Sequence, residues 1–199
     1  MHRNDLKALI IMFFAAAFYQ TAFAQTEREL AAPPRGDTLN ITRSGVYRLV
    51  GDISANGGDG IVITASNVTL NLNGHAVETS APGTGRGIVI TGASGVQVKN
   101  GKVGSFNSNV MVIGSTNVNI EALQIVGQGL APNNGPSEIG IQIVNSRSAL
   151  VRDNNISSVN LGIFVRGGGS TGNRLFENVI TGGPAAANNL LGICYNPAP

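Results

Sequence analysis

A short motif of glycine followed by alternating β-branched residues recurs along this chain of 199 residues. GIVIT occurs twice, at 60–64 and 87–91. Weaker copies are NVMVI from 109, GIQIV from 140, GIFVR from 162 and GICYN from 192. The two closest spacings, from 87 to 109 and from 140 to 162, are equal, and the other spacings are longer. A period of about 22 residues with insertions indicates a repeat architecture, and this constrains the fold more than any other feature.

Each repeat has a second half in which two apolar residues lie five positions apart. The pairs are Leu72 and Val77, Val98 and Val103, Ile120 and Ile125, Val151 and Ile156, and Leu175 and Ile180. The centre of most pairs carries asparagine or glycine, as in Gly74-His75, Asn100-Gly101, Asp153-Asn154 and Glu177-Asn178. These residues tolerate left-handed backbone angles, so the pattern predicts two strands joined by a tight corner. His75 is then a surface corner residue.

A unit of three short strands without a helix predicts one turn of an all-β solenoid, with each strand pairing in parallel with its copies in adjacent turns. Alternation along the first strand gives two inward columns. They are Ile61, Ile88, Val110, Ile141, Ile163 and Ile193, and Ile63, Ile90, Val112, Ile143, Val165 and Tyr195. A leucine-rich repeat would need a leucine-patterned or helical return, and a left-handed hexapeptide solenoid would need a period of six; neither pattern is found.

The segments GVYRLVGDI, DGIVITASNVTLNLNGHAV and GTGRGIVITGASGVQVKNGKV resemble the right-handed parallel β-helix of the pectate-lyase-like superfamily. The repeats are similar to those shared by carbohydrate-binding proteins and sugar hydrolases, and the resemblance covers about residues 37–199. It implies a single-stranded right-handed parallel β-helix of about six turns. The same repeat also occurs in periplasmic assembly factors and surface proteins, so the resemblance specifies the fold better than the activity.

Length variation between repeats falls mainly at one corner, just before the first strand. It predicts three long loops at 78–86, 126–139 and 181–191. Loops along one edge of a solenoid often form its binding face, although surface loops also tolerate insertions at little cost. Candidate ligand-binding residues at this edge and on the adjoining strand are Thr84, Arg86, Asn133, Asn134 and Phe164.

The first strand carries few groups suited to acid–base chemistry. Its outward columns are Val62, Val89, Met111, Gln142, Phe164 and Cys194, then Thr64, Thr91, Ile113, Val144, Arg166 and Asn196. The resembled lyases need a base and usually a cation, and glycosidases need two carboxyl groups facing one sugar bond. The catalytic candidates are therefore Asp59, Arg86 and Arg166. Asp59 and Arg86 lie on adjacent turns, and an ion pair is the favoured interpretation.

The outer columns also predict a continuous apolar patch formed by Val62, Val89, Met111, Ile113, Val144 and Phe164, which either the loops or another surface covers.

On the second strand, Lys99, Glu121 and Arg152 follow one another on successive turns and predict a charge ladder. Asp153 and Glu177 would supply the two carboxyl groups that a glycosidase needs, but this match rests on their number alone. The asparagine beside each of them favours a role in the turn.

A metal site built from histidine or cysteine is excluded by their number. His2 lies in the N-terminal leader, which leaves His75, and Cys194 is the only cysteine, so no internal disulfide forms. A cofactor is not expected. Calcium bound by Asp, Asn and backbone oxygens stays open, with Asp52 and Asp59 in GDISANGGDG as candidates.

The N-terminal segment at positions 1–24 has the pattern of a signal peptide. Arg3 and Lys7 precede the apolar run ALIIMFFAAAF, which is short for a membrane span, and AFA at 22–24 suits cleavage after Ala24. We therefore expect a secreted or periplasmic protein with no membrane contact after cleavage. The remaining basic residues are scattered, so nucleic-acid binding is not expected. Residues 25–36 are interpreted as a linker or N-terminal cap, and 37–199 as the β-helix.

The last repeat begins with GICY and the sequence stops at NPAP. An uncapped solenoid exposes strand edges, so self-association through this end or through the apolar patch is a further expectation. For function two classes stay open. The favoured one is a non-catalytic module that binds polysaccharide or a cell-surface partner, because a carboxylate groove is missing. The other is a polysaccharide lyase or glycoside hydrolase, which only the resemblance supports.

Overall fold

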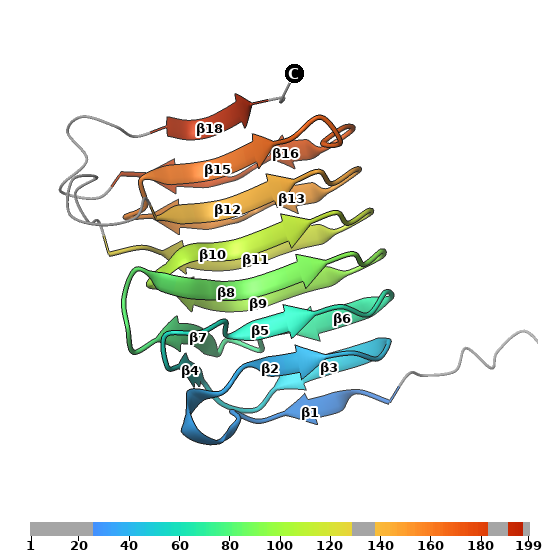
Figure 1. Cartoon of the computed structure of the whole chain (residues 1–199), viewed down its shortest axis with the longest axis vertical. Helices are drawn as coiled ribbons and strands as arrows, with labels where there is room; N and C mark the ends of the chain where they lie inside the picture. Colours follow the sequence, from blue (N-terminus) through green and yellow to red (C-terminus); the bar gives the residue numbers. More distant parts are fainter. Residues whose placement is uncertain (1–25, 129–137, 183–190, 197–199) are drawn as a thin grey trace, which may run out of the picture.

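The computed structural model describes residues 26–128, 138–182 and 191–196 and shows an all-β parallel solenoid (Figure 1). The described part contains six complete turns of three strands and the first strand of a seventh. Asn133 and Asn134 lie outside the described residues. The predicted fold class is confirmed.

The first strand of each turn belongs to a seven-stranded parallel sheet, whose outer surface we call the seven-stranded face. Its strands are β2 (Leu39–Ile41), β5 (Ile61–Ile63), β8 (Thr84–Thr91), β10 (Phe106–Ile113), β12 (Ile139–Val144), β15 (Leu161–Arg166) and β18 (Leu191–Asn196). Both predicted inward columns are in register across these strands. Ile61, Ile88, Val110, Ile141 and Ile163 are all fully buried, as stacked β-branched residues in a solenoid core should be.

The second and third strands form one eleven-stranded parallel sheet that bends at the corner, because β9 and β11 run through it. The second strands are β1 (Arg28–Leu30), β3 (Gly45–Leu49), β6 (Val68–Asn71), β13 (Leu150–Arg152), β16 (Arg174–Phe176) and the first halves of β9 (Gln97–Gly104) and β11 (Asn119–Val126). The third strands are β4 (Ile53–Ala55), β7 (Ala76–Thr79), β14 (Asn155–Ser157), β17 (Val179–Thr181) and the remaining halves of β9 and β11. β1 precedes the first complete turn and pairs with β3, and a 3-10 turn, η1 (Pro34–Gly36), follows it.

The corner between these strands uses left-handed backbone, as the sequence predicted. Asn100, Ala122, Asp153 and Glu177 have φ angles of 59°, 51°, 57° and 55°. One register in the prediction was wrong: Leu70, and not Leu72, pairs with Val98. The corner between β6 and β7 is therefore longer than its copies. Leu72 is nonetheless fully buried, because the longer corner turns its side chain into the core.

The glycine that opens the motif is required by close packing between turns. A Cβ on Gly87 would lie 2.4 Å from the Asn109 carbonyl oxygen and 2.5 Å from Val103 Cγ1. A Cβ on Gly60, Gly140 or Gly162 would also lie less than 3 Å from the carbonyl of the next turn. In the NVMVI repeat Asn109 takes this place. It is fully buried, and its Oδ1 accepts from Phe106 N while its Nδ2 donates to the Ile139 carbonyl.

Two buried polar columns also tie the turns together. Ser115, Ser146 and Ser170 are each about 2% exposed or less, and each Oγ accepts a backbone N–H from the preceding turn. At the corner, Asn154 Nδ2 donates to Asn178 Oδ1 at 2.9 Å and to the Ile120 carbonyl at 3.0 Å. Buried polar groups with satisfied partners specify one register of stacking.

The predicted loops are shorter than expected where the structure describes them. Glu78 and Thr79 belong to β7, and Thr84 to Arg86 belong to β8, so the segment predicted as a loop at 78–86 keeps only residues 80–83 as connection. β8 begins early because Thr84 and Arg86 pair with Phe106 and Ser108 of β10. The other two loops lie mostly at 129–137 and 183–190, outside the described residues.

Candidate functional site

The seven-stranded face carries the outward columns that the sequence predicted. Val62, Val89, Met111, Gln142, Phe164 and Cys194 are in register across β5, β8, β10, β12, β15 and β18. The predicted apolar patch is far less exposed than expected. Val89 is 2% exposed, and the other five residues of that patch are half-buried. Self-association through this patch stays a prediction.

Arg86 and Asp59 form the main charged contact beside this face. The carboxylate of Asp59, in the turn before Arg86, accepts from Arg86 N at 3.0 Å, Nε at 2.9 Å and Nη2 at 2.5 Å. Asp59 is only 17% exposed at its side chain, and the hydrogen bond to it raises the pKa of Arg86. Arg86 Nη1 also lies 4.0 Å from Met111 Sδ, so this side chain reaches both neighbouring turns and covers part of the apolar column. The predicted ion pair is present.

Gln142, Phe164 and Arg166 form a second polar contact on the same face. Gln142 is 6% exposed although it points outward. In the amide orientation that satisfies both partners, its side-chain oxygen accepts from Arg166 Nε at 2.9 Å and Nη2 at 3.3 Å. Phe164 pairs with Gln142 in the strand ladder, so an aromatic ring, an amide and a guanidinium lie together on β12 and β15. We call these three residues the β12–β15 cluster.

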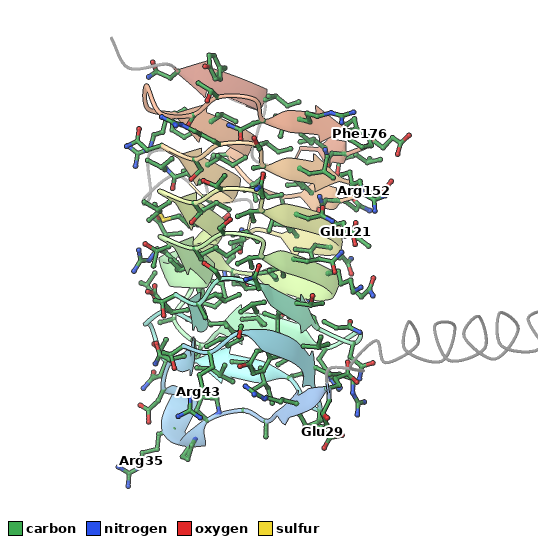
Figure 2. The ribbon with its side chains drawn as sticks, turned by 90° about the vertical axis from the view of Figure 1, so that its right-hand side faces the viewer. Glu29, Arg35, Arg43, Glu121, Arg152 and Phe176 are labelled. Carbon is green, nitrogen blue, oxygen red and sulfur yellow. The ribbon has the colours of Figure 1, made fainter. Side chains whose placement is uncertain are left out.

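The charge column on the second strands is confirmed in register, from Lys99 through Glu121 to Arg152. Figure 2 shows Arg152 above Glu121 on neighbouring strands of this sheet. Arg152 Nη2 donates to Glu121 Oε2 in a short contact, and Gln97 Nε2 donates to Glu121 Oε1 at 2.7 Å. Arg152 Nη1 also donates to Asp153 at 2.8 Å. Glu121 is thus held by its neighbours, which fits a structural role.

Two charged pairs that the sequence pattern did not reveal lie at the third strands and just before them. Asp52 Oδ1 lies 3.1 Å from His75 Nδ1 and accepts from Ala76 N at 2.9 Å; this backbone bond, and then His75, lower the pKa of Asp52. On the next turns, Lys102 Nζ lies 2.7 Å from Glu78 Oε1. The alternation along β7 signals an outward Glu78, but the two members of each pair lie on different turns, and only the register brings them together.

The remaining candidates are Thr84, proposed for ligand binding, and the possible calcium ligands Asp52 and Asp59. Thr84 is exposed at the start of β8, and its Oγ1 donates to the Ala81 carbonyl at 2.5 Å. For calcium, both carboxylate oxygens of Asp59 already accept from Arg86, and Asp52 is bonded to His75 and Ala76. Within residues 26–128, 138–182 and 191–196, no group of three or more His, Cys, Asp or Glu residues is placed to hold a metal ion.

The carboxyl groups beside the seven-stranded face are held by neighbouring groups. Asp59 is the carboxylate at the edge of the seven-stranded face, and Arg86 holds both of its oxygens. Glu138, just before β12, is fully buried and accepts from Gln128 N at 2.7 Å. A general acid or base needs a carboxyl group free to exchange a proton with substrate. Asp153 and Glu177 occupy the left-handed corner positions, as expected for turn residues.

The comparisons with known proteins agree with this architecture. The family model for a right-handed β-helix region matches residues 50–194, which is most of the chain. The chain belongs to the right-handed β-helix family. This is consistent with the resemblance to the pectate-lyase-like superfamily. Comparison with curated proteins and with solved structures gave no match.

The described part of this β-helix protein contains no helix with the length and apolar character needed to cross a membrane.

Proposed function

We propose that this protein is an exported β-helix protein that binds polysaccharide on its seven-stranded face without cleaving it. The observation that carries the proposal is that Arg86 holds the Asp59 carboxylate, beside a face that still presents an aromatic ring and a guanidinium group. The face is a regular ladder, with adjacent strands about 4.8 Å apart. A regular polar surface of this kind suits an extended polymer.

The β12–β15 cluster is the proposed centre of binding. Phe164 offers a ring on which the apolar face of a sugar can stack, because aromatic side chains supply large apolar area at a polar surface. Arg166 is exposed and offers N–H donors to hydroxyl or carboxylate oxygens, and Gln142 positions it from the preceding turn. Orienting a binding group through a buried neighbour reduces the entropy lost on binding.

A cell-surface protein partner is the second candidate. The observation that favours it is the set of half-buried apolar side chains on the same face, among them Met111, Ile113 and Val144. Aromatic, methionine and arginine side chains are enriched where proteins associate.

The test is a screen of the purified chain against neutral and acidic polysaccharides, with and without calcium. Affinity electrophoresis measures binding, and release of reducing ends or unsaturated products measures cleavage. We expect binding without turnover. Turnover of any polysaccharide would contradict the proposal and favour a lyase or hydrolase, and absence of binding to every polysaccharide would leave the protein partner as the better candidate.

Variants locate the site. Phe164→Ala and Arg166→Ala should each weaken binding about tenfold, which corresponds to about 1.4 kcal/mol. Phe176→Ala and Arg174→Ala are the matched controls, because Phe176 and Arg174 form a similar aromatic–guanidinium pair on β16, on another sheet. Equal losses in both sets of variants would place the ligand elsewhere.

Export is tested separately. Expression of the full chain in a bacterial host, followed by intact-mass measurement of the protein in the periplasm or medium, should show an N-terminus at Gln25. A protein that stays in the cell and still carries residues 1–24 would contradict export through a cleaved signal peptide.

A further inference from the structure

β1 is attached to the rest of the solenoid mainly through surface contacts. It pairs with β3 and with no other described strand, and none of its three residues is buried. Arg28 Nη1 donates to the Tyr47 hydroxyl at 2.9 Å. Arg48 on β3 binds Glu27 at 3.2 Å and Glu29 at 2.6 Å, and these three side chains are 34%, 42% and 64% exposed. Ion pairs this exposed contribute little to stability, so β1 is weakly held.

The segment that joins β1 to the first complete turn is exposed and weakly bonded. Of residues 31–35, all but Pro33 are exposed, and none belongs to a strand. The hydrogen bond from Asp37 N to the Pro34 carbonyl, which closes η1, is long at 3.3 Å. Segments with few buried contacts and an exposed backbone open at a low cost in free energy.

Gly36 is the point at which the chain becomes fixed to the solenoid. Its carbonyl accepts from Asn56 N at 3.1 Å, and a Cβ on Gly36 would lie 2.7 Å from the Ser54 carbonyl oxygen. Two residues later, Thr38 Oγ1 donates to the Asp59 carbonyl at 2.8 Å. The boundary between the weakly and the firmly attached parts of the chain therefore falls at the bond before Gly36.

Arg35 lies on the outer side of this boundary. Its side chain is exposed and points away from the first turn in Figure 2, and it makes no hydrogen bond or ion pair with the described residues. Its φ angle is 60°, in the left-handed region that is uncommon for arginine. An exposed basic side chain in a weakly held turn suits proteases whose specificity pocket contains a carboxylate.

The other described basic residues are less suited to cleavage. Most of them lie in paired strands, namely Arg28, Arg48, Arg86, Lys99, Lys102, Arg152, Arg166 and Arg174. Arg43 and Arg147 lie in turns, but their carbonyl oxygens accept from the Tyr47 hydroxyl at 2.7 Å and from Asn117 N at 3.0 Å. A protease must draw the carbonyl of the bond that it cuts into its own donor groups, so these contacts protect both sites.

We propose that β1 is a removable strand and that the bond between Arg35 and Gly36 is a processing site for a serine protease with an acidic specificity pocket. Water is added across this bond, so that Arg35 gains a carboxylate and Gly36 an ammonium group. Noncovalent contacts alone then hold β1, and it dissociates from β3.

Loss of β1 uncovers the edge of β3, at whose end Val50 N donates to the Leu30 carbonyl at 3.0 Å in the intact chain. Unpaired strand edges are the groups through which sheets associate, so processing controls whether this edge is covered. The proposal is independent of polysaccharide binding, because β1 and β3 belong to the eleven-stranded sheet and the β12–β15 cluster lies on the other sheet.

Limited digestion with trypsin, followed by intact-mass measurement, tests the site in the folded exported chain. We expect the first product to begin at Gly36 and to resist further cleavage. Arg35→Gln should abolish this product, whereas the matched control Arg43→Gln, at another exposed arginine in a turn, should retain it. A first cleavage at any other residue, or an unchanged product from Arg35→Gln, would overturn the proposal.

The rate of this cleavage tests the weak attachment of β1. A protease binds an extended segment, so β1 must lift from β3 before the cut. Arg48→Ala should therefore accelerate the cut about fivefold, the effect of losing two exposed ion pairs. Arg152→Ala is the matched control, because Arg152 also binds two carboxylates, Glu121 and Asp153, but on β13. Circular dichroism checks that both variants are folded. Equal rates for the two variants would contradict the weak attachment.

Hydrogen exchange tests the release of β1 directly. After the cut, the amides of β3 and Val50 should exchange faster than in the intact chain, while those of β9 and β11 should be unchanged. Equal protection of β3 before and after the cut would show that β1 stays bound, and would refute its role as a removable strand.

Discussion

Arg86 and Asp59 lie on adjacent turns of the solenoid, and Arg86 donates three hydrogen bonds to the Asp59 carboxylate from its backbone N, Nε and Nη2. Arg86→Ala removes two of these bonds and leaves a carboxylate that is 17% exposed with fewer partners. We expect the free energy of unfolding to fall by about 1–3 kcal/mol. Urea denaturation measures it, and Arg43→Ala at an exposed site is the control, expected within about 0.5 kcal/mol of wild type. An equal effect of both substitutions would mean that the pair does not stabilise the fold.

Gly87 tests the packing between turns. Gly87→Ala places a Cβ 2.4 Å from the Asn109 carbonyl oxygen and 2.5 Å from Val103, so the turns must move apart. Overpacking of this kind destabilises by about 1–3 kcal/mol. Gly51→Ala is the matched control, because a Cβ there meets nothing within 4 Å and the backbone needs no positive φ. The thermal midpoint should fall for Gly87→Ala only; no change in that variant would contradict the packing argument.

Asn154 tests the buried polar column at the corner. It is 1% exposed, its Oδ1 accepts from Leu123 N at 3.0 Å, and its Nδ2 donates to the Ile120 carbonyl. Asn154→Ala leaves these groups unsatisfied, at about 1–3 kcal/mol for each. Asn155, the next residue, is exposed, so Asn155→Ala should be nearly neutral in the same chemical denaturation experiment. Similar stability of the two variants would show that water replaces the asparagine amide.

The lowered pKa of Asp52 predicts how the stability of the fold changes at acid pH. Its pKa is lowered from the ordinary value of 3.8 by the Ala76 N–H bond and then by His75. A carboxyl group with a lowered folded-state pKa stabilises the protein above its unfolded pKa, and this contribution is lost as the pH falls through the folded pKa. Between about pH 4 and pH 2, Asp52→Asn should therefore lose less stability than wild type.

Urea midpoints measured across this acid range are the readout for Asp52. Asp37→Asn serves as a control at an exposed carboxylate with no observed hydrogen bond in the described structure, and it should follow the wild-type curve. Parallel curves for wild type and Asp52→Asn would refute the prediction.

The sequence predicted most of what depends on local pattern. The inward columns, the corner and the pairing of Asp59 with Arg86 follow from the repeat period and the alternation of side chains along each strand. The register error at Leu72 arose because Leu70 and Leu72 are both buried, and the local pattern fits either of them. The strand pairing with the next turn decides that Leu70, and not Leu72, stands opposite Val98.

The candidate site was harder to predict than the fold. The sequence placed Gln142, Phe164 and Arg166 on the outer face, but not the contact between Gln142 and Arg166, because side-chain direction decides it. The exposure of the predicted apolar patch was overestimated, and part of the cover comes from the Arg86 side chain, which extends toward Met111. The Asp52–His75 pair was missed because its two members lie 23 residues apart on adjacent turns, and only the register of the turns brings them together.

The sequence by itself determined that this chain is a parallel solenoid, since recurring β-branched residues at fixed spacing can all be buried together only by stacking turns. The tertiary structure decided which charges meet and how far the outer face is covered. These properties depend on contacts between residues of different turns, far apart in the chain, and such contacts are set by the register and packing of neighbouring turns.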